Sequence, residues 1–451
     1  MATKQNSPRI RILALASLGG ALEYYDFVVF VFLTPVIGKL FFASTIPEWA
    51  REVQTFGIFA AGYVVRPLGG IIMAHFGDTR GRKRMFTFSV LLMAIATFII
   101  ALLPTYSSIG VAAPLLLLAM RMLQGTALGA EAPGGWVFGA EHAKQGHVGL
   151  AVGLLTGGLS LGILLGSVVA AALTFAYSPP QIADGRWRIP FFLGGIFGLT
   201  AMFLRRWLDE TPVFEQMRER AALCRELPLR RLLRSHRSAV VTSMIGTCSL
   251  IAMIVVVILM TPALLQHSFR LSPDVTQVAN LAGAAGLCIG NIATGAAADR
   301  FGTRRVGGIM FGLLIAATYA LSGILLFAGG ALFADDLLSA TAQTLAWMVV
   351  FFFASPAASA AYLTVSETFP LEIRALAIAF FYAIGTAIGG VVGPALFGAL
   401  ISTGSRGSVA IGYVIGALMM ICAAMAEARW GVAAERKPLE TVSRPLSFIE
   451  S

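Results

Sequence analysis

The sequence predicts an all-α membrane protein in which twelve transmembrane helices form two six-helix halves and both chain ends lie in the cytoplasm. Three observations predict this class. Of the 451 residues, 57% are hydrophobic and only 12% are charged, which is about half the charged share of soluble domains. Apolar runs of about 20 residues, each long enough to cross a bilayer as a helix, recur along the chain. Basic residues collect in every second loop between these runs.

The apolar runs are long and continuous, which favours helices over the short alternating strands of a membrane β-barrel. We place the twelve spans at residues 14–42, 54–76, 85–103, 113–138, 149–175, 189–207, 238–264, 274–297, 306–328, 342–364, 376–401 and 409–430. The chain then divides into cytoplasmic tails at 1–13 and 431–451, six-helix halves at 14–207 and 238–430, and a cytoplasmic linker at 208–237. Glu23 and Asp26 interrupt the first apolar run and no signal-peptidase site follows, so we expect the first span to be retained.

The net charge of +10 raises the question of a nucleic-acid surface. With the N-terminus inside, 25 of the 33 Lys and Arg residues fall in cytoplasmic tails and loops, and only five fall outside. This asymmetry is the positive-inside pattern of inner-membrane proteins, so we interpret the charge as an orientation signal and expect no nucleic-acid partner. The four cysteines have no paired spacing and predict no disulfide framework.

Two weak internal repeats indicate that the halves are duplicated. The segment GDTRGRKR, with Asp78, Gly81 and Arg82, follows the second span, and ADRFGTRR, with Asp299 and Arg304, follows the eighth span 221 residues later. Repeats of this kind predict two halves of the same orientation, with the solute path at their interface.

The second repeat lies after the fourth and tenth spans. Glu141 opens AEHAKQGH, and Glu367, 226 residues later, opens ETFPLEIR, which ends at Arg374. The similar offset supports the same division into halves.

These motifs resemble those of a known superfamily. The run GGIIMAHFGDTRGRKRM is similar to the loop signature between helices two and three of major facilitator transporters. GGALEYYDF, RPLGG and RMLQGTALGAE resemble its metabolite:proton symporter branch, and the match runs from about residue 14 to 430, while SETFPLEIRALAIAFFYAIG also resembles the sugar porters. The resemblance implies proton-linked transport of a small metabolite, with a proton gradient in place of any cofactor.

Five ionisable residues lie well inside the spans, namely Glu23, Asp26, Arg66, Arg121 and Glu131. Each costs roughly 2.5 to 3.5 kcal/mol to insert, so we expect them to be functional. All five belong to the first half. We therefore expect the first half to carry proton coupling and the second half to contribute uncharged contacts.

The sharpest hypothesis makes Asp26 the proton site and Arg121 its switchable partner. The proton affinity of a carboxylate depends on a nearby guanidinium, so movement of Arg121 would change it. The resemblance supports this pair, since relatives place an acid on the first helix and an arginine on the fourth. Glu131 and Glu23 are the reserve candidates. The alternative is a permanent salt bridge that only fixes helix packing.

Candidate solute contacts combine the membrane arginines with polar and aromatic residues of the spans. Arg66 precedes Pro67 and either meets a substrate carboxylate or pairs with an acid of the first span. Arg121 and Gln124 lie three residues apart, on a strip of the fourth span that we expect to face the first. The second half adds Gln266, Asn291, Trp347, Tyr362 and Tyr382.

The repeat motifs predict a latch on the cytoplasmic side. Asp78 is placed to accept hydrogen bonds from the N-terminus of a neighbouring helix and Arg82 to pair with loop acids, and Asp299 and Arg304 would mirror them. The alternative is that the basic residues only anchor orientation. The same motifs add four further gating candidates, namely Gly81, Glu141, Glu367 and Arg374.

Absent motifs limit the other function classes. The sequence has no phosphate-binding loop, no histidines at metal-ligand spacing and no nucleophile and base pair, so we expect neither ATP-driven transport, nor a metal site, nor an enzyme. We expect a monomer whose partners are protons, the lipid bilayer and a small solute, with carboxylates ahead of osmolytes and sugars. An exporter or antiporter, or a membrane-embedded sensor or enzyme, remains the alternative.

Overall fold

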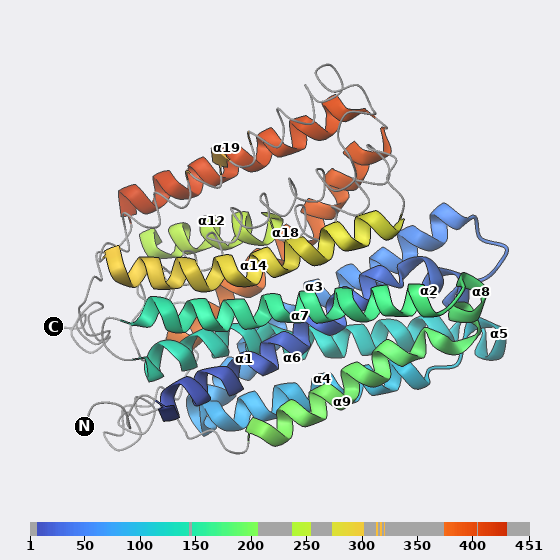
Figure 1. Cartoon of the computed structure of the whole chain (residues 1–451), viewed down its shortest axis with the longest axis horizontal. Coiled ribbons are helices and arrows are strands. Elements are labelled where there is room, and N and C mark those ends of the chain that lie inside the picture. Colours follow the sequence, from blue (N-terminus) through green and yellow to red (C-terminus); the bar gives the residue numbers. More distant parts are fainter. Residues whose placement is uncertain are drawn as a thin grey trace.

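The computed structural model describes residues 7–143, 147–205, 237–253, 273–301, 374–403 and 405–430, with isolated positions at 313, 316, 317 and 320. Within these ranges the regular elements are helices, and eight of them are long and apolar enough to cross a membrane. The long helices run beside one another along the long axis of the molecule (Figure 1). The predicted all-helical membrane fold is confirmed, and the spans predicted at 306–328 and 342–364 lie almost wholly outside the described residues.

Every span predicted in the first half has a helical counterpart. The helices of this half are α1 (Ser7–Phe32), α2 (Thr34–Phe41), α3 (Glu48–Arg80), α4 (Arg82–Leu102), α5 (Tyr106–Ile109), α6 (Ala112–His142), α7 (Val148–Ala176), α8 (Pro179–Gln181), the π-helix η1 (Ile182–Arg186) and α9 (Arg188–Arg205). Four helices of the second half are described, namely α12 (Arg237–Met253), α14 (Pro273–Phe301), α18 (Arg374–Ser402) and α19 (Arg406–Trp430).

The first span differs from its prediction as one helix. It divides into α1 and α2 at Leu33, just before Pro35, whose missing N–H and fixed ring disturb a regular helix. The Ile37 amide still donates to the Leu33 carbonyl at 2.8 Å, so the chain bends there and the hydrogen-bond pattern continues.

The signature motif also departs from its prediction, because it is barely a loop. Asp78 and Arg80 still belong to α3, α4 begins at Arg82, and Gly81 alone separates the two helices. Gly81 has φ of 113°, a conformation that residues with a Cβ rarely adopt. The glycine of this motif therefore makes the tight reversal between two spans possible.

Glycines on α7 let this helix pack closely on two sides. A Cβ at Gly158 would lie 2.5 Å from the Cβ of Ser17 on α1, and one at Gly162 would overlap the Ala21 carbonyl of the same helix. On another side, a Cβ at Gly153 would lie 2.8 Å from the carbonyl oxygen of Asn291 on α14. Helix α7 is thus held between its own half and the second half.

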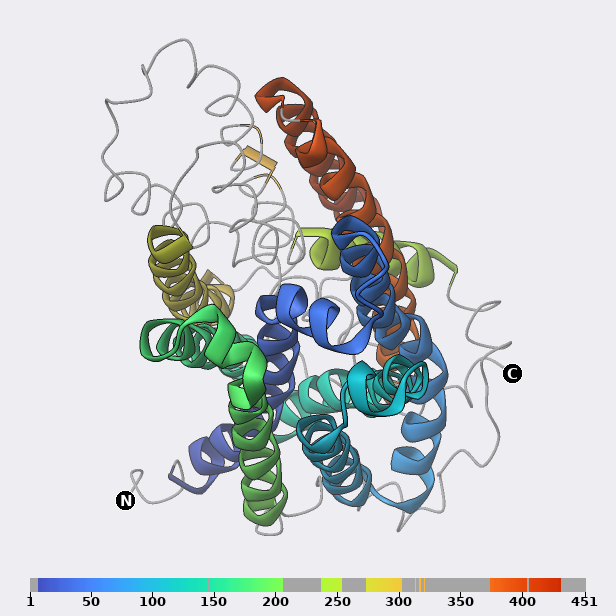
Figure 2. The same cartoon turned by 90° about the vertical axis from the view of Figure 1, so that its right-hand side faces the viewer.

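Among the described helices, the two halves meet chiefly along two helix pairs, and α18 also contacts α6. Helix α14 packs along α7, and α18 packs along α3. Figure 2 shows α14, in olive and yellow, beside α7, in green. Inside the first half, α1 packs mainly on α7, α6 on α3 and α4 on α9. The charged residues predicted to be functional lie on α1, α3 and α6.

Candidate functional site

Asp26 lies in the centre of the first half. Its side chain is only 2% exposed. The preceding residue, Tyr25, fixes this part of α1, because its hydroxyl donates to the Pro190 carbonyl at the start of α9 at 2.8 Å. On the opposite side, Gly166 of α7 allows α1 to approach closely. The carboxylate is therefore carried by a helix that is held from two directions.

Arg121 of α6 is the cationic partner of Asp26. Its Nη1 donates to Asp26 Oδ2 at 3.2 Å and to Gln124 Oε1 at 2.8 Å. The guanidinium carbon lies 3.6 Å from the centroid of the Phe30 ring, a cation–π contact that holds the group flat against α1. The arginine is 4% exposed, so this is a buried ion pair.

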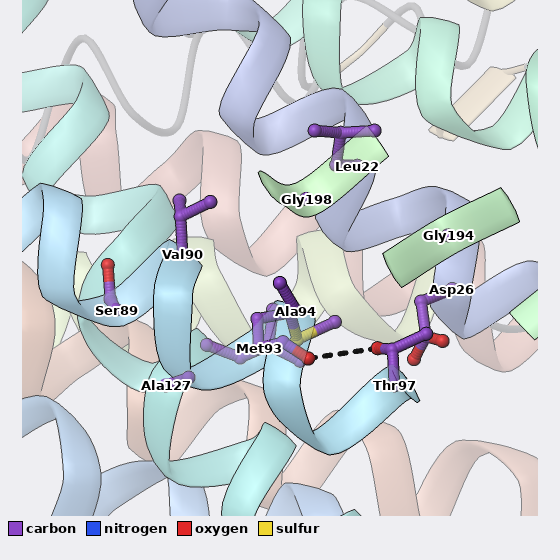
Figure 3. A pocket seen from close by; sticks show the side chains of 11 residues that line it. Leu22, Asp26, Ser89, Val90, Met93, Ala94, Thr97, Ala127, Gly194 and Gly198 are labelled. Carbon is purple, nitrogen blue, oxygen red and sulfur yellow. Dashed lines mark hydrogen bonds between the residues drawn. The ribbon is translucent and has the colours of Figure 1, made fainter. Parts of the chain in front are cut away.

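Gln124 completes the network. Its Nε2 donates to Asp26 Oδ2 at 2.6 Å and to Thr97 Oγ1 of α4 at 2.8 Å. Thr97 in turn donates to the Met93 carbonyl at 3.0 Å, which leaves its hydroxyl oxygen free to accept. Figure 3 shows Asp26 and Thr97 side by side and the bond from Thr97 towards Met93. Three helices, α1, α4 and α6, are thus joined around one carboxylate oxygen.

The network leaves three buried polar atoms without a hydrogen-bond partner among the described residues. These atoms are Oδ1 of Asp26 and Nε and Nη2 of Arg121. Buried polar atoms normally find partners, so an unpaired carboxylate oxygen beside an unpaired guanidinium edge is unusual. Oδ1 of Asp26 can accept a proton. Nε and Nη2 of Arg121 can together donate two hydrogen bonds to a carboxylate.

Arg66 of α3 is a second buried arginine, 5% exposed. Its guanidinium carbon lies 4.2 Å from the centroid of the Tyr63 ring, and its charge acts on that of Arg121. Gly129, on the same helix as Arg121 and Gln124, packs against this part of α3, because a Cβ there would overlap the Arg66 carbonyl. The strip predicted to face the first span therefore faces two helices, with its polar side chains towards α1 and its glycines towards α3.

A narrow recess lies beside the network. Its walls come from α1, α4, α6 and α9, and a cavity volume of about 20 Å³ gives it room for about one water molecule. Figure 3 shows Asp26, Thr97 and Gly194 at one end and Ser89 at the other. All of its lining residues in the described part of the chain belong to the first half. The recess is therefore separate from the interface between the halves.

The comparisons with known proteins agree with this architecture. A family model described as Major Facilitator Superfamily matches residues 16–322 and 242–446, which together cover most of the chain. The chain belongs to the major facilitator superfamily. Membership confirms the predicted family, places the chain among transporters and not among enzymes, and makes it a multi-pass inner-membrane protein.

Two curated transporters are similar to part of the chain. A putative proline/betaine transporter of Staphylococcus aureus (strain COL) is 38% identical over 210 residues, which is 46% of this chain and 44% of that protein. The proline/betaine transporter of Escherichia coli (strain K12) is 34% identical over 206 residues, 46% of this chain and 41% of that protein. The matched segments therefore span less than half the length of either relative.

Solved structures of the superfamily share the fold. The proton:xylose symporter XylE bound to 6-bromo-6-deoxy-D-glucose has a TM-score of 0.79 at 18% identity, with 97% of this chain and 98% of that chain covered. An inward-open form of the xylose transporter XylE from E. coli has a TM-score of 0.65 at 19% identity, with 96% and 99% covered. At this identity the likeness shows the major facilitator fold alone.

Asp299, one of the predicted latch residues, lies at the contact between the two halves of the facilitator fold. Its carboxylate oxygens accept the backbone N–H groups of Gly149 at 2.8 Å and Leu150 at 2.7 Å, in the first turn of α7. A carboxylate at a helix N-terminus also meets the positive end of the helix dipole. The contact has the predicted form, and its role in gating stays a prediction.

Two of the predicted solute contacts in the second half lie between the halves, and their role in solute binding stays a prediction. The Tyr382 ring of α18 meets the Trp136 ring of α6 edge to face, with centroids 5.3 Å apart. Asn291 of α14 donates through Nδ2 to Ser160 Oγ of α7 at 2.9 Å. Both residues are about 1% exposed, so they hold the facilitator halves together in this conformation.

Several predicted residues are only partly placed. The backbones of Glu23, Glu131, Asp78, Arg82, Glu141 and Arg374 lie in α1, α6, α3, α4, α6 and α18, and their side chains are outside the described structure. The remaining predicted contacts and gating residues lie outside the described residues altogether, namely Gln266, Trp347, Tyr362, Glu367 and Arg304.

Sequence reasoning missed some residues of the site. Thr97 and Phe30 contact the network directly, yet a threonine and a phenylalanine in apolar runs give no signal of their own. Arg205 and Glu427 are buried charges near the ends of spans, 1% and 7% exposed, and neither was among the predicted candidates. Because both residues lie away from the middle of the spans, their positions gave no sign that they are buried.

Proposed function

We propose that this facilitator is a proton-coupled symporter that moves a small organic solute across the inner membrane by alternating access. One observation carries the proposal. In the middle of the first half, a buried carboxylate, a buried guanidinium and a glutamine form a network that is only partly satisfied. The network lies where protonation of Asp26 would change the bonding of Arg121.

The unpaired polar atoms of the network argue against a purely structural role for the Asp26–Arg121 salt bridge. A buried ion pair offsets its desolvation cost only when the remaining donors and acceptors are also satisfied. Here one oxygen of Asp26 and two nitrogens of Arg121 have no hydrogen-bond partner in the described part of the chain. Such a pair stabilises the fold poorly but can exchange partners readily, which is what coupling requires.

The coupling step follows from the charges. When Asp26 takes up a proton, its carboxylate becomes neutral and the attraction to Arg121 falls. Arg121 keeps its bond to Gln124 Oε1, and its Nε and Nη2 edge is free to hold an anionic group of the solute. Release of the solute returns Arg121 to Asp26 and favours loss of the proton. Proton and solute therefore move together.

The contacts between the halves support alternating access. Asp299 holds the first turn of α7, and Trp136 and Tyr382 meet between α6 and α18. These contacts are local and mostly polar or edge-to-face, so they can break without unfolding either half. We propose that they close the cytoplasmic side in this conformation and separate when the solute is released inward.

We propose that the solute carries a carboxylate, because two buried arginines lie near each other in this site. The relatives named for proline and betaine are consistent with this class, since both compounds combine a carboxylate with a charged nitrogen. Small zwitterions are therefore the first candidates, ahead of simple organic acids. A sugar is the second candidate, supported by the likeness of the fold to a proton:xylose symporter.

The test uses Asp26→Asn in proteoliposomes. A thermal-shift screen of the purified protein against organic acids, betaines, amino acids and sugars first identifies a solute. We expect Asp26→Asn to lose uphill accumulation of that solute while counterflow, which needs no net proton movement, continues. Asp184→Asn, at an acidic residue in η1, serves as the control and should behave like the parent. If Asp26→Asn still concentrates the solute, the coupling role is wrong.

A further inference from the structure

We infer that the recess beside Asp26 is the route by which the coupled proton leaves for the cytoplasm, separate from the solute path between the halves. The inference rests on the proposed function, which makes Asp26 the proton site, and it adds the route. It follows from the position of the recess, its direction and the chemistry at its inner end.

The recess is built entirely within the first half. Ser89, Met93 and Thr97, at intervals of four residues, line one face of α4 over roughly 12 Å at 1.5 Å per residue. Gly194 and Gly198 line the opposite wall on α9, where the lack of side chains leaves space. A solute path between the halves would be lined by both halves, and this recess is not.

The direction of the recess follows from the helices that line it. The basic loops place the starts of α1 and α4 and the end of α9 on the cytoplasmic side. Leu22 precedes Asp26 by one turn of α1, and Gly198 follows Gly194 by one turn of α9. Leu22 therefore lies nearer the cytoplasm than Asp26, and Gly198 lies nearer the cytoplasm than Gly194. The recess therefore extends from Asp26 in the direction in which an imported proton must leave.

The inner end has an atom suited to proton release. Asp26 lines the recess, its Oδ2 accepts from Arg121 and Gln124, and its Oδ1 has no hydrogen-bond partner among the described residues. The proton on neutral Asp26 would pass from Oδ1 to a water molecule in the recess. The products are a hydronium ion, which leaves, and a carboxylate, which Arg121 holds. Ser89, at the other end, supplies a polar wall for that water.

The first experiment measures access to the recess without a transport substrate. Single cysteines are introduced by Ser89→Cys, Met93→Cys and Ala101→Cys after the native cysteines are replaced by serine. Silver ions, small cations that bind thiols, are added to the cytoplasmic face of inside-out vesicles, and the unreacted thiols are then counted with a maleimide in denaturant. Ala101 is the matched control, because it lies one turn beyond Thr97 on α4 in a packed core and is 0% exposed.

We expect the Ser89→Cys and Met93→Cys variants to react about tenfold faster than Ala101→Cys, since the recess beside them has room for an ion about the size of a water molecule and the packed core around Ala101 has not. Adding Ala127→Leu, which places a larger side chain in the wall from α6, should slow both reactions. Equal reaction at all three positions, or no effect of Ala127→Leu, would overturn the route.

The second experiment measures transport, with L-proline as the probe. In proteoliposomes, Ala127→Leu should slow proton-driven accumulation of L-proline by about tenfold, because it obstructs proton transfer and not the solute path. Counterflow of L-proline in the same variant should equal that of the parent, which also shows that the protein is folded. Ala127→Ser keeps the space and should match the parent in both assays.

The two proposals fail in different ways. Uphill accumulation by Asp26→Asn would remove the proposed function and the route with it. Loss of coupling in Asp26→Asn together with normal accumulation by Ala127→Leu would overturn the route alone.

Discussion

Asp26 gathers two donors on one carboxylate oxygen, while its other oxygen and the second edge of Arg121 have no partner in the described structure. A bidentate arginine–carboxylate pair would have satisfied both edges and fixed the geometry. Here Arg121 divides its bonds between Asp26 and Gln124 instead, and Gln124 donates to the same Asp26 oxygen at 2.6 Å. The glutamine keeps the network joined whichever partner Arg121 holds.

The hydroxyl of Thr97 gives a direct test of this role for Gln124. Thr97→Val keeps the shape of the side chain but removes the acceptor that orients the Gln124 amide at 2.8 Å. Loss of one buried hydrogen bond costs about 1 kcal/mol, so we expect proton-driven uptake to fall roughly fivefold. Counterflow and thermal stability measured beside it should change little, and Thr97→Ser should restore uptake. Normal uptake by Thr97→Val would show that Gln124 needs no such support.

Helices of the first half depend on glycine for their spacing. Helix α6 lies against α3 so closely that a Cβ at Gly125 would overlap the Gly62 carbonyl oxygen. The carbonyl belongs to the backbone and cannot turn aside, so the helices must separate if a side chain is added. The same closeness brings Arg66 and Arg121, on these two helices, into one site.

Gly125→Ala should therefore destabilise the protein although alanine is the better helix former. We expect a loss of about 1 to 3 kcal/mol from overpacking, seen as a lower Tm in detergent. Gly57→Ala on α3 is the matched control, because a Cβ there meets nothing within 4 Å. That variant should keep or slightly raise Tm, since alanine favours helix by about 1 kcal/mol. Equal changes in both variants would contradict the packing argument.

The contact of Asp299 with the first turn of α7 joins two helices from different halves. Asp299→Asn keeps the shape but turns one acceptor oxygen into a donor that faces backbone N–H groups. Hydrogen bonds to a charged group contribute about 1.5 to 3 kcal/mol, so the closed cytoplasmic side should open more often. Native Cys288, whose carbonyl packs near Gly157 in the same interface, reports the opening when the other cysteines are replaced.

We expect maleimide to alkylate Cys288 about tenfold faster in Asp299→Asn than in the parent, a factor that corresponds to about 1.4 kcal/mol. Asp184→Asn in η1 should leave the rate unchanged. An unchanged rate in Asp299→Asn would mean that the contact does not hold the cytoplasmic side closed.

At the scale of the whole molecule, the described charges predicted to work in coupling lie in the first half, and both halves meet along α7 with α14 and α3 with α18. The two proposed functions are thus separated in space, with proton exchange proposed inside one half and solute movement proposed between the halves. Rocking of one half against the other could link them, since α7 packs both on α1, which carries Asp26, and on α14.

The membrane potential limits the gradient that such a molecule can build. With one proton per neutral solute, roughly 150 mV supplies about 3.5 kcal/mol, which allows an accumulation of a few hundredfold. We expect a protonophore to reduce the accumulation ratio to about one while ATP depletion at constant potential leaves it unchanged. An uphill gradient that survives the protonophore would exclude proton drive.

The sequence by itself determined the features that depend on local composition. Length and hydropathy predicted the spans, and the insertion cost of charge marked Asp26, Arg66 and Arg121 as unusual, because each of these properties belongs to a residue and its near neighbours. The glycine and acidic positions of the repeated motifs likewise singled out Gly81 and Asp299, since a repeat is visible in the order of residues alone.

The pair of Asp26 and Arg121 was predicted, but only the tertiary structure decided which other residues meet. It added Gln124 to that pair, supplied Thr97 from a third helix, placed Tyr382 against Trp136 and formed the recess between four helices. The physical reason is that neighbours across helices depend on the rotation and spacing of each helix. Packing of the whole bundle sets these, and no single span encodes them.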